Sequence, residues 1–183
     1  APHGKAYFES HLEALKNYWE TVSKGKLIIE YDVLPVADTE FFQLPQSMAY
    51  YGQKPPELGL AELFRDTWQM VDQLEPAIDF SLYQSFVIFH AGSDQQSNLS
   101  FSPTNTPHDL FTGFIIMGDS VLVDDSTFLV EEGLIMPETI SQDTRIGALN
   151  AVLAHEFGHQ LGLVDLYNTR NFLKMCGLVL NLF

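Results

Sequence analysis

Residues 154–165 read Ala-His-Glu-Phe-Gly-His-Gln-Leu-Gly-Leu-Val-Asp, and the fold and function predicted for the chain depend on them. The stretch contains the pattern H-E-x-x-H. Residues four apart lie one above the other on a helix, so His155 and His159 can aim two imidazoles at one point. Zinc takes nitrogen ligands at about 2.0–2.1 Å, which suits this pair. Glu156 leaves the helix beside that point, where a general base for a zinc-bound water is expected.

Helical periodicity supports this placement. Apolar side chains recur at helical spacing from residue 144 to residue 161 and predict one buried face. They are Ile146, Leu149, Val152, Leu153, Phe157 and Leu161. We expect Ser141 or Asp143 to cap the start of this helix. Gly162 is expected to end it, because glycine adopts the left-handed conformation at low cost, and the chain can then return Asp165 toward the histidines.

Asp165 is the economical candidate for a third ligand. No Asp, Glu or His follows it in the chain, so a ligand from further downstream is excluded unless residues are missing from the end. A carboxylate is a normal zinc ligand, and three protein ligands leave one position open for water. The alternative is an accidental match on a buried helix. A chance match that also includes Gly162 and Asp165 at their fixed offsets from the histidines is much rarer than a chance match to H-E-x-x-H alone.

The sequence H-E-F-G-H-Q-L-G-L-V-D-L-Y-N resembles the active-site helix of the immune inhibitor A family, the M6 or M6-like secreted bacterial metallopeptidases. The match includes Tyr167, two residues after the aspartate. Residues 86–92, Phe-Val-Ile-Phe-His-Ala-Gly, are similar to the family's central strand, which ends in H-A-G. The resemblance is strong over residues 84–92 and 110–169 and weaker before them.

This resemblance implies a metzincin-like zinc endopeptidase that cleaves protein or peptide substrates. The implied fold is α/β (α+β), with a twisted, mixed, mostly parallel sheet, backing helices and an active-site helix. The implied ligands are His155, His159 and Asp165, with Glu156 as the general base. Tyr167 is a candidate to orient the aspartate, although a plain core tyrosine is an equal alternative. The implied location is secreted, outside a bacterial cell.

Two further features are expected from the same resemblance. Related peptidases pair an extended substrate with an edge strand just before the active-site helix, which here falls within residues 111–123. They also place a methionine in a tight turn beneath the metal. Met175 is the only methionine downstream and is therefore the candidate. The usual W-D-L-M-like segment is absent, which puts the floor of a specificity pocket in doubt.

Composition narrows the class of protein. The 183 residues predict a single catalytic domain, 1–183, either mature or excised from a longer, C-terminally truncated chain. The formal net charge of −15 argues against nucleic acid as a partner, and no apolar run is long enough for a membrane span. Asp124-Asp125 and Glu131-Glu132 are candidates for calcium, although exposed acid pairs usually bind none. Cys176 is the only cysteine, so no internal disulfide can form.

The remaining patterns predict an alternating helix and strand order. A capping box at residues 10–13 predicts a helix that Gly25 ends. Residues 27–34 alternate as a strand, 35–56 are irregular, and 56–75 form a second helix with Leu74 facing inward. Residues 85–89 predict a buried strand in a right-handed parallel crossover, with a structural His90 at its end. A polar loop covers 91–110, followed by strands at 113–117 and 121–130 around turns at 118–119 and 124–126.

The leading functional hypothesis is peptide hydrolysis with Glu156 as base. The competing hypothesis is a catalytically inactive, zinc-stabilised binding or structural domain of a larger secreted protein. The intact Glu156 argues against that alternative, since a structural zinc site has no need of this residue, whereas the short C-terminus argues for it. A third alternative, a metal-free scaffold with buried histidines, would be excluded by stoichiometric zinc.

Overall fold

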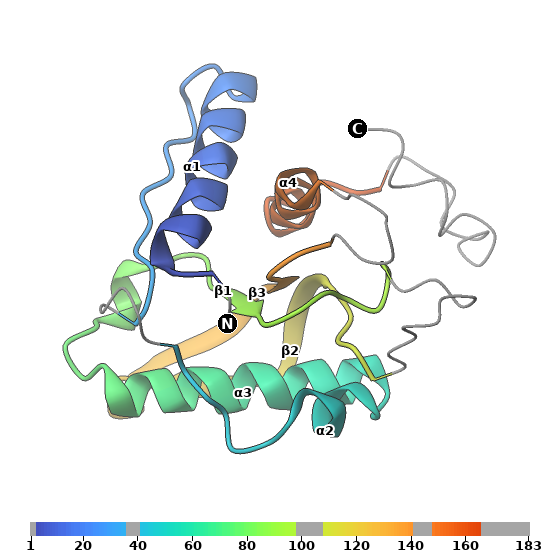
Figure 1. Cartoon of the computed structure of the whole chain (residues 1–183). Helices are drawn as coiled ribbons and strands as arrows, with labels where there is room; N and C mark the ends of the chain where they lie inside the picture. Colours follow the sequence, from blue (N-terminus) through green and yellow to red (C-terminus); the bar gives the residue numbers. More distant parts are fainter. Residues whose placement is uncertain (1–2, 36–40, 98–107, 141–147, 166–183) are drawn as a thin grey trace.

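The computed structural model describes residues 3–35, 41–97, 108–140 and 148–165 (Figure 1). Within these ranges the chain forms a mixed α/β fold of helices and one three-stranded sheet. The helices are α1 (Lys5–Val22), α2 (Met48–Gly52), α3 (Pro56–Leu74), α4 (Leu149–Gln160) and a short 3-10 helix, η1 (Phe80–Leu82). The strands are β1 (Val87–His90), β2 (Gly113–Val123) and β3 (Phe128–Pro137). The predicted α/β class is therefore confirmed.

The sheet has the order β1-β3-β2, with β3 parallel to β1 and antiparallel to β2. The expected mixed sheet is present, but parallel pairing does not predominate among the described strands. The expected turn at residues 118–119 is wrong, because β2 continues through it with an irregularity between Ile116 and Val121. The turn at 124–126 is confirmed, since all three residues have positive φ, from 52° to 67°.

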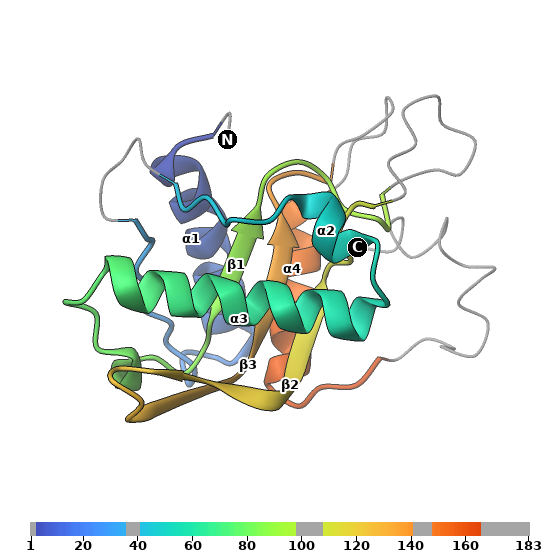
Figure 2. The ribbon, with the colours of Figure 1, turned by 90° about the horizontal axis from the view of Figure 1, so that it is seen from below.

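Helices cover both faces of this sheet. α3 lies across one face, and α4 lies on the other with α1 packed beside it (Figures 1 and 2). Successive residues of β3 point to opposite faces, so fully buried Ile135 joins the core beneath α3, whereas Leu134 and Met136 join the core with Leu153 of α4. The sheet thus holds α4 in place from below. No helix in the described part of the chain is long and apolar enough to cross a membrane.

The first helix begins earlier than its sequence pattern predicts. α1 starts at Lys5, so Ser10 lies inside it, and the Ser10 hydroxyl donates to the carbonyl of Tyr7 at 2.6 Å. The predicted capping box is therefore wrong, because a serine within a helix can bond back to the preceding turn. Gly25 does follow the helix end with φ of 72°, and its N–H donates to the Glu20 carbonyl at 2.8 Å. That part of the prediction is confirmed.

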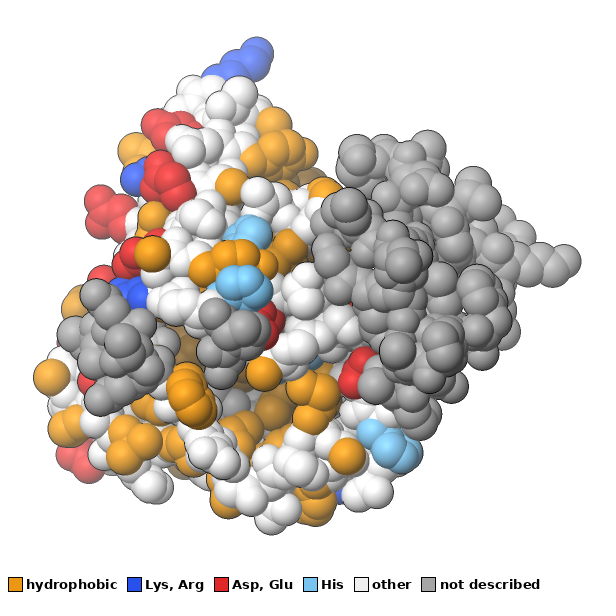
Figure 3. Space-filling view, in the orientation of Figure 1, with side chains coloured by type: hydrophobic (Ala, Val, Ile, Leu, Met, Phe, Trp, Pro, Cys, Tyr) orange, Lys and Arg blue, Asp and Glu red, His pale blue; other side chains and the backbone are white. Residues whose placement is uncertain are grey.

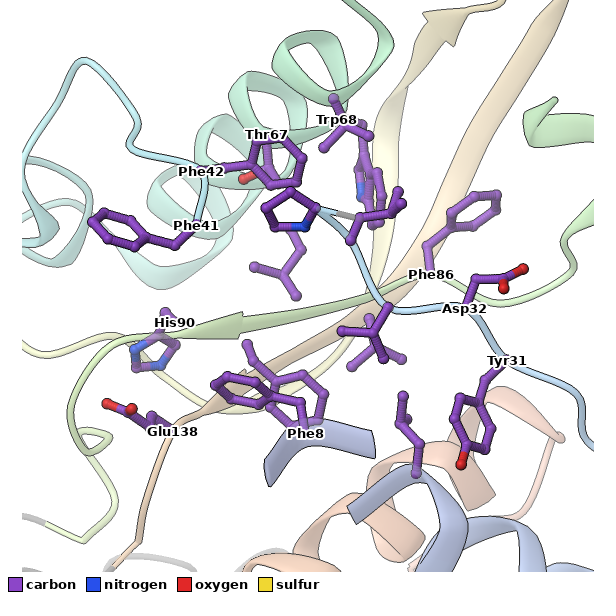
Figure 4. Close-up of a pocket in the computed structure, with 18 of the residues that line it drawn as sticks. Phe8, Tyr31, Asp32, Phe41, Phe42, Thr67, Trp68, Phe86, His90 and Glu138 are labelled. Atoms are coloured by element: carbon purple, nitrogen blue, oxygen red, sulfur yellow. The ribbon is translucent and has the colours of Figure 1, made fainter. Parts of the chain in front are cut away.

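Residues 27–34 are extended but form no strand. Their alternation places Leu27, Ile29, Tyr31 and Val33 against the core beside α1 and α4, while the residues between them are mostly exposed. A cavity of about 730 Å³ is lined both by this segment and by β1. Figure 4 shows Tyr31 and Asp32 toward one end of it and His90 and Glu138 toward the other. The predicted strand and its parallel crossover are therefore wrong. The alternating apolar side chains of residues 27–34 pack against the core, but the backbone of this segment does not join the sheet.

The second predicted helix is confirmed with two differences around it. α3 buries Leu60, Phe64, Trp68 and Val71 as expected, but Leu74 is 62% exposed. Within the segment expected to be irregular, α2 packs on α3 through a close backbone approach. A Cβ added at Gly59 would lie 2.2 Å from the Tyr51 carbonyl oxygen, so only glycine fits there.

Candidate metal centre

α4 carries both histidines and ends as the sequence predicts. Gly162 has φ of 84°, and its N–H donates to the His159 carbonyl at 2.9 Å. The next residue, Leu163, donates its N–H to the Gly158 carbonyl at 3.0 Å, so the chain folds back over the last turn. The start differs from the prediction. The N-cap residue is Ala148, whose side chain makes no capping hydrogen bond. The expected caps, Ser141 and Asp143, lie outside the described residues.

The turn after α4 brings three potential ligands together. The Nε2 atoms of His155 and His159 lie 3.1 Å apart. Asp165 Oδ1 is 3.3 Å from the first and 3.4 Å from the second. Each side chain is about a quarter exposed, at 26%, 25% and 23% respectively. Among the described residues this is the only group of three or more His, Cys, Asp or Glu side chains that converge in this way.

This triangle has the dimensions of a zinc site. Ligand atoms at about 2.0–2.1 Å from a tetrahedral zinc are separated from one another by about 3.3–3.4 Å. The three observed separations, 3.1, 3.3 and 3.4 Å, agree with that value. The three donor atoms therefore fit a zinc ion, and each of the three side chains is partly exposed.

The hydrogen bonds around the triangle support the same conclusion. Asp165 Oδ1 is buried and has no hydrogen-bond partner. A hydrogen bond between the two imidazoles can satisfy one nitrogen, but Asp165 Oδ1 then has the two rings at 3.3 and 3.4 Å without a hydrogen bond from either. A cation at the centre satisfies all three atoms at once, which is the state that buried polar groups normally reach.

The orientation of His159 is fixed from behind. Its Nδ1 lies 2.9 Å from the Leu163 carbonyl oxygen, which can only accept a hydrogen bond. We therefore assign the proton to Nδ1, so that Nε2 presents a lone pair to the centre of the triangle. Metal-bound histidines commonly use a backbone carbonyl in this way. The turn at Gly162 thus supplies both the aspartate and the carbonyl that orients the histidine.

Glu156 lies beside the triangle and bonds to the sheet. Its Oε2 accepts a hydrogen bond from the backbone N–H of Phe114 in β2 at 2.9 Å. Burial raises the pKa of the Glu156 carboxyl above its ordinary value, while the Phe114 bond and the two nearby histidines oppose that rise. A half-buried carboxyl of this kind, beside the three converging side chains and outside them, is suited to proton transfer.

Contacts on the back of α4 hold it against α1 and the sheet. The Gln160 side chain accepts from the Ser85 hydroxyl at 2.6 Å and donates to Glu132 Oε1 at 3.2 Å. On the α1 side, Trp19 packs against Gly158, where an added Cβ would lie 3.4 Å from the indole ring. The helix that carries the two histidines is therefore held in place by contacts with α1 and with the sheet.

The remaining predicted site residues are Tyr167, Met175 and His90. Tyr167 and Met175 lie outside the described residues. His90 is not part of the triangle; its Nδ1 lies 3.0 Å from the Ala91 carbonyl oxygen, and burial lowers its pKa. Its Nε2 is buried without a hydrogen-bond partner among the described residues, so the expected structural role stays a prediction.

The acid pairs considered for calcium make protein hydrogen bonds. Asp124 Oδ2 accepts from the N–H of Phe80 at 2.9 Å, and Glu131 accepts from the Ser120 hydroxyl at 3.3 Å. Neither pair belongs to a converging set of three ligands in the part of the chain that the structure describes. The surface agrees with the acidic composition, since Lys and Arg are sparse on the face shown in Figure 3.

Sequence reasoning predicted the three side chains that converge but missed the backbone groups that contact the site. The pattern does not identify the Phe114 amide or the Leu163 carbonyl, because backbone groups carry no residue-type signal. It also missed the second half of β3, where Leu134, Ile135 and Met136 support α4 and α3 from one strand. The apolar run from 134 to 136 is a signal that could have identified this central strand.

Comparison of the chain with protein-family models, with curated proteins and with solved structures gives no match. Arguments about function therefore depend on the geometry of the site and on the sequence pattern.

Proposed function

We propose that this chain is a zinc-dependent endopeptidase that hydrolyses peptide bonds in protein substrates. The observation that carries the proposal is the triangle of His155, His159 and Asp165, whose edges match a tetrahedral zinc site. The resemblance to secreted M6-like peptidases supports the same reaction and a location outside a bacterial cell. The metzincin-like arrangement belongs to this proposal as well.

In this proposal the two imidazoles and the carboxylate hold the ion and leave one side open. A zinc ion there would polarise the substrate carbonyl and lower the pKa of an attacking water. Glu156 would take the proton of that water and pass it to the amine that leaves. The hydrogen bond from Phe114 holds the carboxylate at the edge of the sheet, so the base would lie next to a peptide bound along that edge.

β2 suits the task of holding the peptide. It is an edge strand in the order β1-β3-β2, and it lies within the range expected for the substrate-binding strand. An edge strand offers backbone N–H and C=O groups to an extended chain whatever its side chains. Because Glu156 touches this strand at Phe114, a peptide paired along it would pass the metal centre.

The proposal is tested by hydrolysis of unfolded casein, measured with and without a chelator, together with zinc content. We expect cleavage that the chelator abolishes and about one zinc per chain. Glu156→Gln should retain the zinc and lose cleavage, whereas the matched variant Glu131→Gln, at an exposed acid, should retain both. Cleavage by Glu156→Gln at the rate of the unchanged protein would refute this mechanism.

The alternative is a zinc-stabilised binding or structural domain without catalysis. Asp165 lies beyond the end of α4, so an ion in the triangle would also tie the following segment to the helix, which is a structural task. Zinc content is the same under both proposals. One zinc per chain with no cleavage of casein would favour the alternative.

A further inference from the structure

The outer edge of β2 presents backbone groups at every second residue. Phe114 sends its N–H away from β3, to Glu156, and its partner Leu134 sends its own N–H away from β2, to Phe86. In an antiparallel pair such positions alternate with positions bonded across the ladder. Thr112, Phe114 and Ile116 therefore direct their N–H and C=O groups to the outside of the sheet.

The first of these three positions is already occupied. The side-chain amide of Gln96 accepts from the Thr112 N–H at 3.0 Å and donates to the Thr112 carbonyl at 2.7 Å. One residue exchanging both bonds with another is the pattern of two paired strands. The Gln96 side chain thus takes the place that the backbone of a bound peptide would occupy opposite Thr112.

Buried contacts hold Gln96 in this position. Asp94, which is 3% exposed, accepts from the Ser97 N–H and from the Thr112 hydroxyl, both at 2.8 Å. The N–H of Gln95 donates to the Leu110 carbonyl at 2.8 Å. The segment on both sides of Gln96 is therefore bonded to the start of β2, so the amide is preorganised rather than a casual surface contact.

Beyond this point the edge is open. Glu156 takes the N–H of Phe114, but no described residue pairs with the carbonyl of Phe114 or with the N–H and C=O of Ile116. The Ile116 side chain is 73% exposed, so nothing among the described residues covers this position. The available stretch thus begins at the catalytic carboxylate and runs away from Gln96.

We propose that Gln96 is a specificity-determining residue that limits backbone pairing with a substrate to one side of the bond that is cut. This inference rests on the proposed peptidase function. An antiparallel peptide, the slightly more stable pairing, runs from Ile116 toward Thr112. The residues on the amino side of the cut bond then pair with Ile116 and Phe114, and those on the carboxyl side find the edge closed at Thr112. The preferred substrate is a peptide extended on its amino side.

The first test measures binding without hydrolysis, by NMR amide exchange with acetyl-Thr-Leu-Thr-Leu-Thr-amide at millimolar concentration, in the presence of a chelator that prevents the proposed cleavage. In the unchanged protein we expect the peptide to slow exchange of the Ile116 amide and to leave the already slow Thr112 amide as it was. In Gln96→Ala, Thr112 should exchange faster alone and slow when the peptide is added. Equal Thr112 exchange in both proteins, or no effect at Ile116, would overturn the inference.

The second test measures kcat/KM for peptides carrying one casein cleavage site, lengthened by two residues on either side. Two added backbone hydrogen bonds predict a gain of about tenfold on the amino side and little gain on the carboxyl side. Gln96→Ala should raise the carboxyl-side gain, and the control Gln95→Ala, at an exposed neighbour, should not. A purely structural Gln96 would lower stability and leave this ratio unchanged, which would count against the inference.

The two tests separate this inference from the proposed function. Protection at Ile116 but not at Thr112, with no cleavage of casein, would support the role of Gln96 in binding and refute the peptidase. Chelator-sensitive cleavage with equal gains on both sides would support the peptidase and refute the role of Gln96.

Discussion

If the chain binds zinc as proposed, Asp165→Asn should abolish most of the stabilisation that the ion gives. The carboxylate supplies one corner of a triangle whose edges are 3.1, 3.3 and 3.4 Å, and it would be the only negative charge among the three proposed ligands. An amide is neutral and binds zinc far less well. Without it, two imidazoles remain, and they cannot hold the ion in a defined position.

The size of the effect follows from linkage. At a free zinc concentration 100 times the dissociation constant, binding stabilises the folded state by about 2.7 kcal/mol. For a domain of this size each kcal/mol raises Tm by about 2–4 °C, so zinc should raise Tm by about 5–11 °C. Loss of even an outer-shell partner costs about 10–100-fold in metal affinity. A 100-fold loss leaves about 0.4 kcal/mol, which corresponds to about 1 °C.

Without metal the same substitution should do little harm. Asp165 Oδ1 is buried without a hydrogen-bond partner, a condition that costs about 1–3 kcal/mol and that is worse for a charged group than for a neutral one. We therefore expect the Tm of metal-free Asp165→Asn to equal or exceed that of the metal-free unchanged protein. Only the unchanged protein should show a large rise in Tm when zinc is added.

The assay is a thermal melt with zinc and with chelator, on the unchanged protein, Asp165→Asn and the control Asp119→Asn. Asp119 is exposed on β2 and should keep the full zinc response. A zinc-induced rise of the same size in Asp165→Asn would refute the assignment of Asp165 as a ligand. A fall in the Tm of the metal-free variant by several degrees would refute the argument about its unpaired oxygen.

Three further predictions concern the base and the core. Glu156→Gln should keep zinc affinity within a few fold and lower kcat by about 10²–10⁴, the usual contribution of a general base. Loss of zinc binding in this variant would instead show that Glu156 is a metal ligand. Gly133→Ala should destabilise the fold by about 3 kcal/mol, because the new Cβ would lie 2.4 Å from the buried Phe86 carbonyl oxygen. Ordinary stability in a urea titration would contradict that contact. Leu153→Ala should cost about 2–5 kcal/mol, since Leu153 is 0% exposed in the core beneath the metal centre, and an unchanged urea midpoint would show that it is not core.

The sequence was most informative where the interactions are local. The spacing of His155 and His159, the stop at Gly162 and the return of Asp165 all lie within a few residues of one another, and helix geometry converts that spacing directly into position. α3 was predictable for the same reason, since its buried face repeats every three or four residues. Leu74 has the spacing of the buried face but is exposed, because it is the last residue of α3 and lies beyond the edge of the core.

Sequence reasoning failed where a pattern is compatible with two environments. Alternation in residues 27–34 predicts one buried side, but it does not say whether a second strand pairs with the backbone. Ser10 can cap a helix or bond back to Tyr7 inside one, and only the position of the first turn decides between these states. The contacts between Gln96 and Thr112 join residues 16 apart through backbone groups, so no residue pattern marks them.

Glu156 joins the locally encoded centre to the edge strand, which the sequence placed only through resemblance. The helix sets its distance from the histidines, and the Phe114 N–H sets the direction of its carboxylate. A peptide that reaches the metal cannot use that N–H while Glu156 holds it, so the peptide must rely on the Phe114 carbonyl and on Ile116. Anything that shifts β2 along β3 would therefore move a bound peptide relative to Glu156 and the histidines, which α4 carries. Under the proposed function, the register of the β2–β3 hairpin, together with α4, would determine whether Glu156 meets the bond to be cut.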